Sequence, residues 1–182
     1  MNKVDQFLGN ISSDDYDIIG EIKDILFSDK KVHVLVGDGS NGKTSLIHVF
    51  KNMLGDKIFQ LSHEAVSSAL LDNAYIPYIM NCEYIVIDGV TGLINEKIIL
   101  QLVNGYVCQY HKPYTNNWSQ IKMSPKKIIV ATNLNPKHII SNQIVPMANI
   151  IRFNQVKNPD INLVDDISKN HHKDVYEYLA NY

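Results

Sequence analysis

Residues 32–46 read Val-His-Val-Leu-Val-Gly-Asp-Gly-Ser-Asn-Gly-Lys-Thr-Ser-Leu and contain two overlapping glycine motifs. Gly37, Gly39 and Gly42 match G-x-G-x-x-G, the pattern of a dinucleotide-binding turn. Residues 37–44 match G-x-x-x-x-G-K-T, the pattern of a phosphate-binding loop, or P-loop. The two motifs make different demands on the rest of the chain, so the neighbouring sequence has to decide between them.

The neighbouring sequence favours the P-loop. A dinucleotide site needs an acidic residue at the tip of the next strand, where it binds ribose. The next strand-like stretch, residues 57–61, has no acid at its tip. A P-loop needs Lys and then Ser or Thr after its last glycine, so that backbone N–H groups, Lys and a helix N-terminus hold phosphate oxygens. The predicted nucleotide-binding residues are Gly37, Asp38, Gly39, Ser40, Asn41, Gly42, Lys43, Thr44 and Ser45.

The pattern of apolar residues predicts an α/β fold. Val32–Val36 is a short run, apolar except for His33, that suits a strand buried on both faces, and residues 43–54 have the periodicity of a helix. Strands that alternate with helices predict a mostly parallel sheet flanked by helices. Further strands are expected at 57–61, 84–87, 127–131 and 149–153, and further helices at 14–27, 64–71, 95–103 and 172–179.

One segment interrupts this alternation. Residues 106–123 contain two stretches of alternating character around the turn-rich sequence Lys-Pro-Tyr-Thr-Asn-Asn, which predicts an inserted β-hairpin. The expected organisation is a helical segment at 1–30, a P-loop ATPase core at 31–155 and a polar connector with a helix at 156–182.

The composition limits the classes of function. The chain has 182 residues and a formal net charge of −2, so no broad attraction to nucleic acid is expected. Cys82 and Cys108 form no C-x-x-C pair, which argues against a zinc site and a disulfide framework. No apolar run approaches the ~20 residues needed to cross a bilayer, and no secretory signal is visible. We expect a single intracellular domain with no membrane partner.

Two strand tips carry polar residues that suit nucleotide chemistry. Asp88 closes a buried strand, where a carboxylate would bind Mg²⁺ together with the Thr44 hydroxyl, although it could also cap the next segment. Most ATPases of this kind have a second acid next, whereas this chain has Gly89, and slow hydrolysis is therefore conceivable. Asn133 ends another strand and would face the γ-phosphate, or else begin a turn before Pro136.

Arginine content and missing motif positions argue against two other P-loop classes. The chain has one arginine, Arg152, among 17 basic residues. Nucleotide kinases neutralise their phosphates with several arginines. Small GTPases need D-x-x-G after the second strand, where this chain has Thr91 three residues after Asp88. They also need N-K-x-D further along the chain, whereas the Asn-Lys-Val-Asp of residues 2–5 precedes the P-loop.

The ordered set of motifs resembles the superfamily 3 helicases of DNA viruses, which include the papillomavirus, parvovirus and poxvirus-type replication helicases. Three stretches carry the resemblance: "GDGSNGKTS", "YIVIDG" and "QIKMSPKKIIVATN", within residues 32–153. It implies an AAA+-like core that binds ATP and Mg²⁺, assembles into a homo-hexameric ring and pulls single-stranded DNA through the pore. His111 and Lys112 fall at the hairpin tip that contacts the DNA backbone in the family.

The resemblance leaves several points open. Arg152 is either a shifted arginine finger, which completes a neighbour's ATP site, or a structural ion-pair partner. An initiator or primase would be a separate protein, and a viral chain would act in the cytoplasm or nucleus of its host. The expected function is an ATP-dependent helicase or translocase on single-stranded DNA. The alternatives are a non-motor ATP-binding assembly module with little hydrolysis and an RNA-directed NTPase of the picornavirus type.

Overall fold

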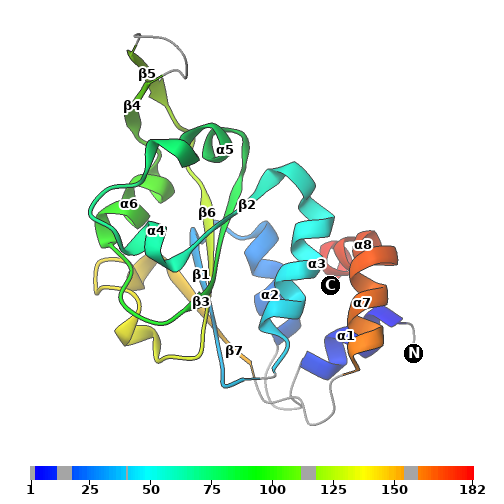
Figure 1. Cartoon of the computed structure of the whole chain (residues 1–182). Coiled ribbons are helices and arrows are strands. Elements are labelled where there is room, and N and C mark those ends of the chain that lie inside the picture. The colour runs from blue at the N-terminus through cyan, green and yellow to red at the C-terminus, as the bar shows by residue number, and fades with distance from the viewer. Residues whose placement is uncertain (1–2, 12–17, 40, 112–117, 154–159) are drawn as a thin grey trace.

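A parallel β-sheet covered by helices on both faces forms the main body of the protein (Figure 1). The structure is a computed structural model that describes residues 3–11, 18–39, 41–111, 118–153 and 160–182. The sheet has the spatial order β2-β3-β6-β1-β7, and all of its pairings are parallel. Its strands are β1 (Val32–Val36), β2 (Ile58–Leu61), β3 (Tyr84–Val90), β6 (Lys127–Thr132) and β7 (Ala148–Arg152).

Alternate residues of each strand enter two separate hydrophobic cores. In β1, Leu35 joins one core, whereas Val34 and Val36 join the other. In β6, Ile129 and Ala131 face the same side as Leu35. Because both faces are covered, the strands need apolar residues at nearly every position, which is why they read as continuous hydrophobic runs.

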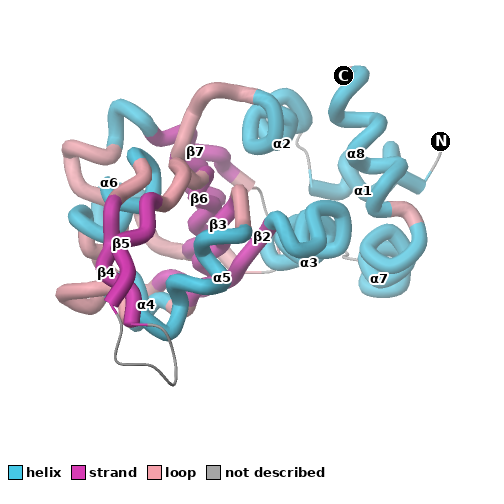
Figure 2. The backbone as a smooth tube through the Cα atoms, turned by 90° about the horizontal axis from the view of Figure 1, so that it is seen from above, coloured by secondary structure: helices cyan, strands magenta, loops and turns pink. Residues whose placement is uncertain are grey.

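The two faces carry different sets of helices (Figure 2). The first set is α1 (Lys3–Ile11), α2 (Ile18–Phe27), α3 (Lys43–Leu54), α7 (Ile161–Asn170) and α8 (His172–Asn181). The second set is α4 (His63–Ser67), α5 (Ile76–Asn81) and α6 (Glu96–Asn104). Short 3₁₀ turns are η1 (Gly55–Lys57), η2 (Asn73–Tyr75), η3 (Pro136–His138) and η4 (Val145–Met147). None of the helices in the described residues is long and apolar enough to cross a membrane.

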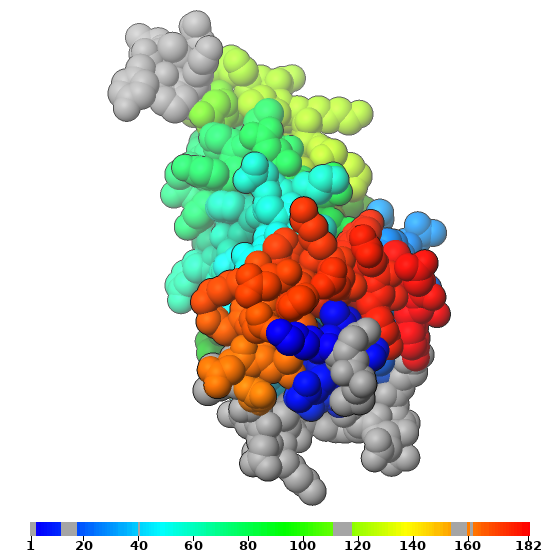
Figure 3. All heavy atoms as spheres, turned by 90° about the vertical axis from the view of Figure 1, so that its right-hand side faces the viewer, coloured from blue at the N-terminus to red at the C-terminus, as the bar shows by residue number. Residues whose placement is uncertain are grey.

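The segments near the two chain ends pack together. In Figure 3, α1 lies against α7 and α8 on one surface of the molecule. Leu163 and Ile167, four residues apart on α7, are buried in the core that Phe7 and Leu8 of α1 also enter. Each such apolar side chain contributes about 1.5–3 kcal/mol when it is fully buried. The first and last parts of the described chain therefore share one core.

The sequence predicts most elements to within a few residues. The strand at 32–36 and the helix at 43–54 have the expected bounds, and the hairpin forms as β4 (Val107–His111) and β5 (Trp118–Lys122). The antiparallel pairing runs from Val107 opposite Lys122 to His111 opposite Trp118. The hairpin projects from the end of the sheet opposite the P-loop (Figure 1).

Three expectations about helices are wrong. The polar connector contains helix α7, which begins where the Asp160 side chain accepts from Leu163 N at 3.1 Å and is held by its packing on α1 and α3. The helix expected at 64–71 ends at Ser67, and α5 forms where no helix was expected. Only the Ile18–Phe27 part of the helix expected at 14–27 lies in the described residues.

Candidate functional site

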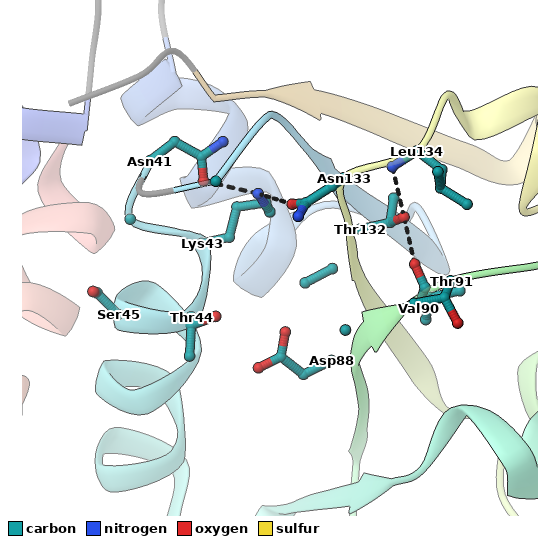
Figure 4. A pocket seen from close by; sticks show the side chains of 14 residues that line it. Asn41, Lys43, Thr44, Ser45, Asp88, Val90, Thr91, Thr132, Asn133 and Leu134 are labelled. Atoms are coloured by element: carbon teal, nitrogen blue, oxygen red, sulfur yellow. Dashed lines mark hydrogen bonds between the residues drawn. The ribbon is translucent and has the colours of Figure 1, made fainter. Parts of the chain in front are cut away.

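The carboxyl ends of three neighbouring strands form one pocket, as parallel α/β sheets favour. The P-loop follows β1, Asp88 lies near the end of β3, and Asn133 follows β6 (Figure 4). The pocket has a volume of about 440 Å³. It is lined by Gly39, Asn41, Gly42, Lys43, Thr44, Ser45, Asp88, Gly89, Val90, Thr91, Ala131, Thr132, Asn133 and Leu134. Most of the predicted nucleotide-binding residues and both predicted strand-tip residues therefore come together; Ser40 lies outside the described residues.

Two glycines of the P-loop are required by its conformation. A Cβ on Gly37 would overlap the side-chain amide of Asn41 and the carbonyl oxygen of Phe153. Gly42 has φ +87°, in the left-handed region, and a Cβ there would lie 2.5 Å from Cγ2 of Ile11. Gly39 has open space around it and an ordinary φ. The loop therefore depends on the glycines of the P-loop motif rather than on the middle glycine of the dinucleotide motif.

The N-terminus of α3 opens into this pocket. Its N-cap residue is Gly42, which has no side chain to accept from the first N–H groups of the helix. A helix start of this kind favours an anion, because the helix dipole and the N–H groups both point toward it. Figure 4 shows the Thr44 side chain directed toward the pocket, whereas Ser45 points away from it. The loop and the helix start therefore suit a phosphate group.

Lys43 lies at the centre of the site and is only 7% exposed. Its Nζ donates to the Gly37 carbonyl oxygen at 2.6 Å, Asn41 Oδ1 at 2.8 Å and Asn133 Oδ1 at 3.0 Å. Burial lowers the pKa of Lys43, while the carboxylates of Asp88 and Asp38 act in the opposite direction. A cation that burial destabilises gains from an anionic ligand, so Lys43 suits a phosphate partner.

The Asp88 carboxylate faces the start of α3 across the pocket. Figure 4 shows the carboxylate and the Thr44 hydroxyl directed toward each other. In the described residues no cluster of three or more His, Cys, Asp or Glu side chains could hold a metal. Mg²⁺ needs less than that, because it is usually bound by one or two carboxylates together with substrate phosphates and water. Thr44 and Asp88 are therefore the pair that fits Mg²⁺ here.

The tip of β3 departs from regular strand geometry just after Asp88. The pairing between β3 and β6 shifts between Ile87 and Val90, and Gly89 has φ +68°. Thr132 Oγ1 donates to the Val90 carbonyl oxygen at 2.7 Å and accepts from Leu134 N at 3.0 Å. These bonds hold the tip of β3 against the tip of β6. Because of this bulge, side chains after Asp88 do not follow the regular alternation between the two faces of the sheet.

Two lining residues and one residue packed behind the P-loop are not expected from the sequence. Thr91, three residues after Asp88, lines the pocket on the side away from the P-loop (Figure 4). Thr132 braces the two strand tips, and Ile11 of α1 packs against Gly42. The sequence offers one signal for Thr91, which is its position three residues after Asp88. A residue so soon after the end of a strand stays at the same end of the sheet.

The remaining predicted residues lie away from the pocket. Arg152 is exposed at the end of β7, opposite Val36 in the strand register, and it is not a lining residue. His111 ends β4 at the opposite end of the sheet, but its side chain is outside the described residues, as is Lys112. The structure therefore gathers most of the residues predicted to bind nucleotide and metal in one pocket, and Arg152 lies outside it.

Comparison with known proteins shows the fold of the chain. No protein-family model matches, and no curated protein matches by sequence. The A-form apo structure of the NrS-1 C-terminal region has a TM-score of 0.68 at 15% identity, covering 99% of this chain and 44% of that one. A further apo structure, of NrS-1 residues 305–718, has a TM-score of 0.65 at 15% identity and covers 99% and 45%. This chain spans less than half the length of the solved structures it matches.

Proposed function

We propose that the protein is an ATP-dependent helicase or translocase of the superfamily 3 type that acts on single-stranded DNA. The observation that carries the proposal is the meeting of Lys43, Asp88 and Asn133 with the start of α3 in one pocket. These groups come from three strand ends, and a P-loop, a metal-binding acid and a γ-phosphate contact are the parts that ATP hydrolysis needs.

Each residue has a distinct part in the proposed reaction. The loop and Lys43 bind the phosphates of ATP, and Lys43 exchanges its contacts with Asn41 and Asn133 for phosphate oxygens. Thr44 and Asp88 hold Mg²⁺, which when bound would neutralise charge on the phosphate oxygens. Asn133, released from Lys43, contacts the γ-phosphate and so distinguishes ATP from ADP.

One strand connects the pocket to the hairpin. Strand β6 ends at Thr132, next to Asn133, and begins at Lys127, five residues after the end of β5. Residues Ile128–Ala131 are buried, and β6 pairs with both β1 and β3. A rigid central strand of this kind can transmit a movement at Asn133 to the hairpin, where His111 and Lys112 are proposed to contact the DNA backbone.

A ring of identical subunits is part of the proposal. Among the described residues that line the pocket, none is an arginine, and an arginine would stabilise charge in the transition state. Arg152 lies exposed on β7, the edge strand of the sheet, where a neighbouring subunit can approach it. We therefore propose a homo-hexamer in which Arg152 serves the neighbour's site, with any initiator or primase as a separate partner.

A second candidate is a non-motor module that binds ATP to assemble. Gly89 favours it, because this residue lines the pocket where most related ATPases have a second acid. Without that carboxylate the attacking water has one polarising group fewer. Such a module would bind ATP tightly but hydrolyse it near the background rate.

ATP hydrolysis with and without nucleic acid tests both candidates. Wild type, Lys43→Ala and Asp88→Ala are compared, with Lys173→Ala as a control because Lys173 is an exposed lysine on α8. A motor predicts turnover that single-stranded DNA stimulates, that both site variants abolish and that the control retains. Tight binding without turnover supports the assembly module. Stimulation by RNA alone supports the RNA-directed alternative, and ordinary turnover in Lys43→Ala would contradict all three.

A further inference from the structure

Thr91 is the hydroxyl-bearing side chain at the end of β3 in the candidate site. It is exposed, lines the pocket and lies across from the P-loop (Figure 4). The neighbouring Val90 carbonyl already accepts from Thr132, and Gly89 has no side chain. On this wall, after Asp88, the Thr91 hydroxyl is therefore the side-chain group that could contact a water molecule beside the γ-phosphate.

His63 contacts Thr91 from the neighbouring strand end. His63 is the first residue of α4, directly after β2, and its Nδ1 lies 3.4 Å from Thr91 Oγ1. The two residues are 28 apart in the chain and meet because β2 pairs with β3 in parallel. Gly92 lies beside the ring, since a Cβ there would be in ordinary van der Waals contact with His63 Cε1, at 3.5 Å.

The surroundings of the ring indicate which nitrogen carries the proton. His63 Nε2 is buried and has no hydrogen-bond partner among the described residues. A proton on Nε2 would be a buried donor without an acceptor, which is the rarer and costlier arrangement. We therefore place the proton on Nδ1, where it donates to Thr91 Oγ1.

This arrangement leaves the Thr91 hydroxyl with two free interactions. A hydroxyl oxygen has two lone pairs and one hydrogen. One lone pair accepts from His63, so the other can accept from a water molecule and the hydrogen can be donated to a phosphate oxygen. A hydroxyl fixed in this way can orient water for attack on the γ-phosphate, which lowers the entropy cost of reaching the transition state.

We propose that Thr91 orients the attacking water, the role that a second acid has in related ATPases, and that His63 is the positioning residue that fixes the Thr91 hydroxyl. The proposal rests on the proposed ATP hydrolysis. It makes Gly89 compatible with turnover, because a hydroxyl held by a histidine takes over the orientation of water. Thr91 would touch the water directly, whereas His63 would act only through Thr91.

Steady-state ATP hydrolysis by matched variants of the full chain tests this pair. Thr91→Val keeps the shape and removes the hydroxyl, and Thr91→Ser keeps the hydroxyl. We expect Thr91→Val to lower kcat about tenfold or more with KM within about twofold, and Thr91→Ser to stay within about threefold of wild type. Thr91→Ala repeats the measurement without the extra methyl group. Wild-type kcat in both Thr91→Val and Thr91→Ala overturns the proposal.

The role of His63 is separated from a structural one by a double-mutant cycle. His63→Asn retains a donor near the position of Nδ1 and is expected to keep most of kcat, whereas His63→Leu is expected to lose about as much as Thr91→Val. The double variant Thr91→Val/His63→Leu should be no slower than Thr91→Val alone, because the two act as one unit. Losses that multiply, or an inactive His63→Asn with a native unfolding curve, overturn the positioning role.

Failure of this inference can be told from failure of the proposed function. Wild-type turnover equal to that of Lys43→Ala contradicts hydrolysis itself and the pair with it. Wild-type turnover that Lys43→Ala abolishes and Thr91→Val leaves unchanged contradicts the pair alone.

Discussion

Two buried lysines lie at opposite ends of the sheet and have different surroundings. Lys43 lies at the carboxyl ends of the strands and is 7% exposed. Lys126 lies at their amino ends, just before β6, and is 1% exposed. Burial lowers the pKa of both side chains. Lys126 Nζ donates to the Cys82 carbonyl oxygen at 2.5 Å, to Ser124 Oγ at 3.0 Å and to the Met80 carbonyl oxygen at 3.4 Å.

The difference between the two lysines lies in what borders them. Each donates to two backbone carbonyls, but Lys43 also donates to the amide oxygens of Asn41 and Asn133 and lines a pocket of about 440 Å³. The remaining contact of Lys126 is with Ser124 Oγ, within its own chain segment. Burial of a lysine therefore does not by itself mark a site, whereas burial beside an open pocket does.

Replacing Lys43 is expected to have the largest effect. Lys43→Met should lower ATP turnover about 10²–10³-fold, because it removes a cation that contacts the phosphates in the transition state. The matched variant Lys126→Met should retain turnover per folded molecule. Steady-state kinetics at saturating ATP measures both, and equal losses in the two variants would erase the distinction between the two lysines.

The glycines of the P-loop provide the next comparison. Gly37→Ala should lower the free energy of unfolding by about 3 kcal/mol and prevent nucleotide binding, because the new Cβ overlaps Asn41 and the Phe153 carbonyl. Gly39→Ala should be tolerated, since nothing lies near its Cβ position. Urea unfolding and binding of a fluorescent ATP analogue measure the two effects. A damaging Gly39→Ala beside a harmless Gly37→Ala would contradict this account of the loop.

Lys126 is expected to affect stability rather than chemistry. Lys126→Met should lower the free energy of unfolding by about 2 kcal/mol, because the buried Cys82 carbonyl loses its donor. Chemical denaturation measures the change, and Lys173→Met, at an exposed position on α8, is the control. Unchanged stability in Lys126→Met would mean that a water molecule replaces the ammonium group as the donor to the Cys82 carbonyl.

The last expected effect is a dependence of stability on pH. Burial lowers the pKa of His33 on β1 from 6.5 to about 4, partly opposed by its contact with the Lys30 carbonyl. Between these pH values the unfolded chain binds a proton that the folded chain does not. The contribution is therefore complete above pH 6.5 and declines by about 1.4 kcal/mol per pH unit as the pH falls toward 4.

The matched variant His33→Val should have a shallower decline in this range, because valine does not titrate. Unfolding free energies at pH 7, 6 and 5 for the two proteins measure the difference. Parallel curves would show that His33 is protonated as readily in the folded chain as in the unfolded one.

Local sequence was sufficient to predict an element wherever the pattern lay within one strand or one loop. The run Val32–Val36 identified a strand buried on both faces, and parallel pairing then placed Asp88 and Asn133 at the same edge as the P-loop. Helix α7 escaped prediction because Leu163 and Ile167 provide only a short apolar stripe, whose burial depends on α1 and α3. The contact between His63 and Thr91 escaped it because the strand order, not the spacing, brings them together.

The sequence by itself determined the P-loop, the strands around it and the identity of the acid at the tip of β3, because glycine conformation and strand burial are properties of short segments. Tertiary structure decided why two of its glycines are required, since only the folded chain places Asn41 and Phe153 against Gly37 and Ile11 against Gly42. It also decided that Lys43 lines a pocket while Lys126 is enclosed. Partners that lie far apart in the chain create those differences, and local patterns do not record them.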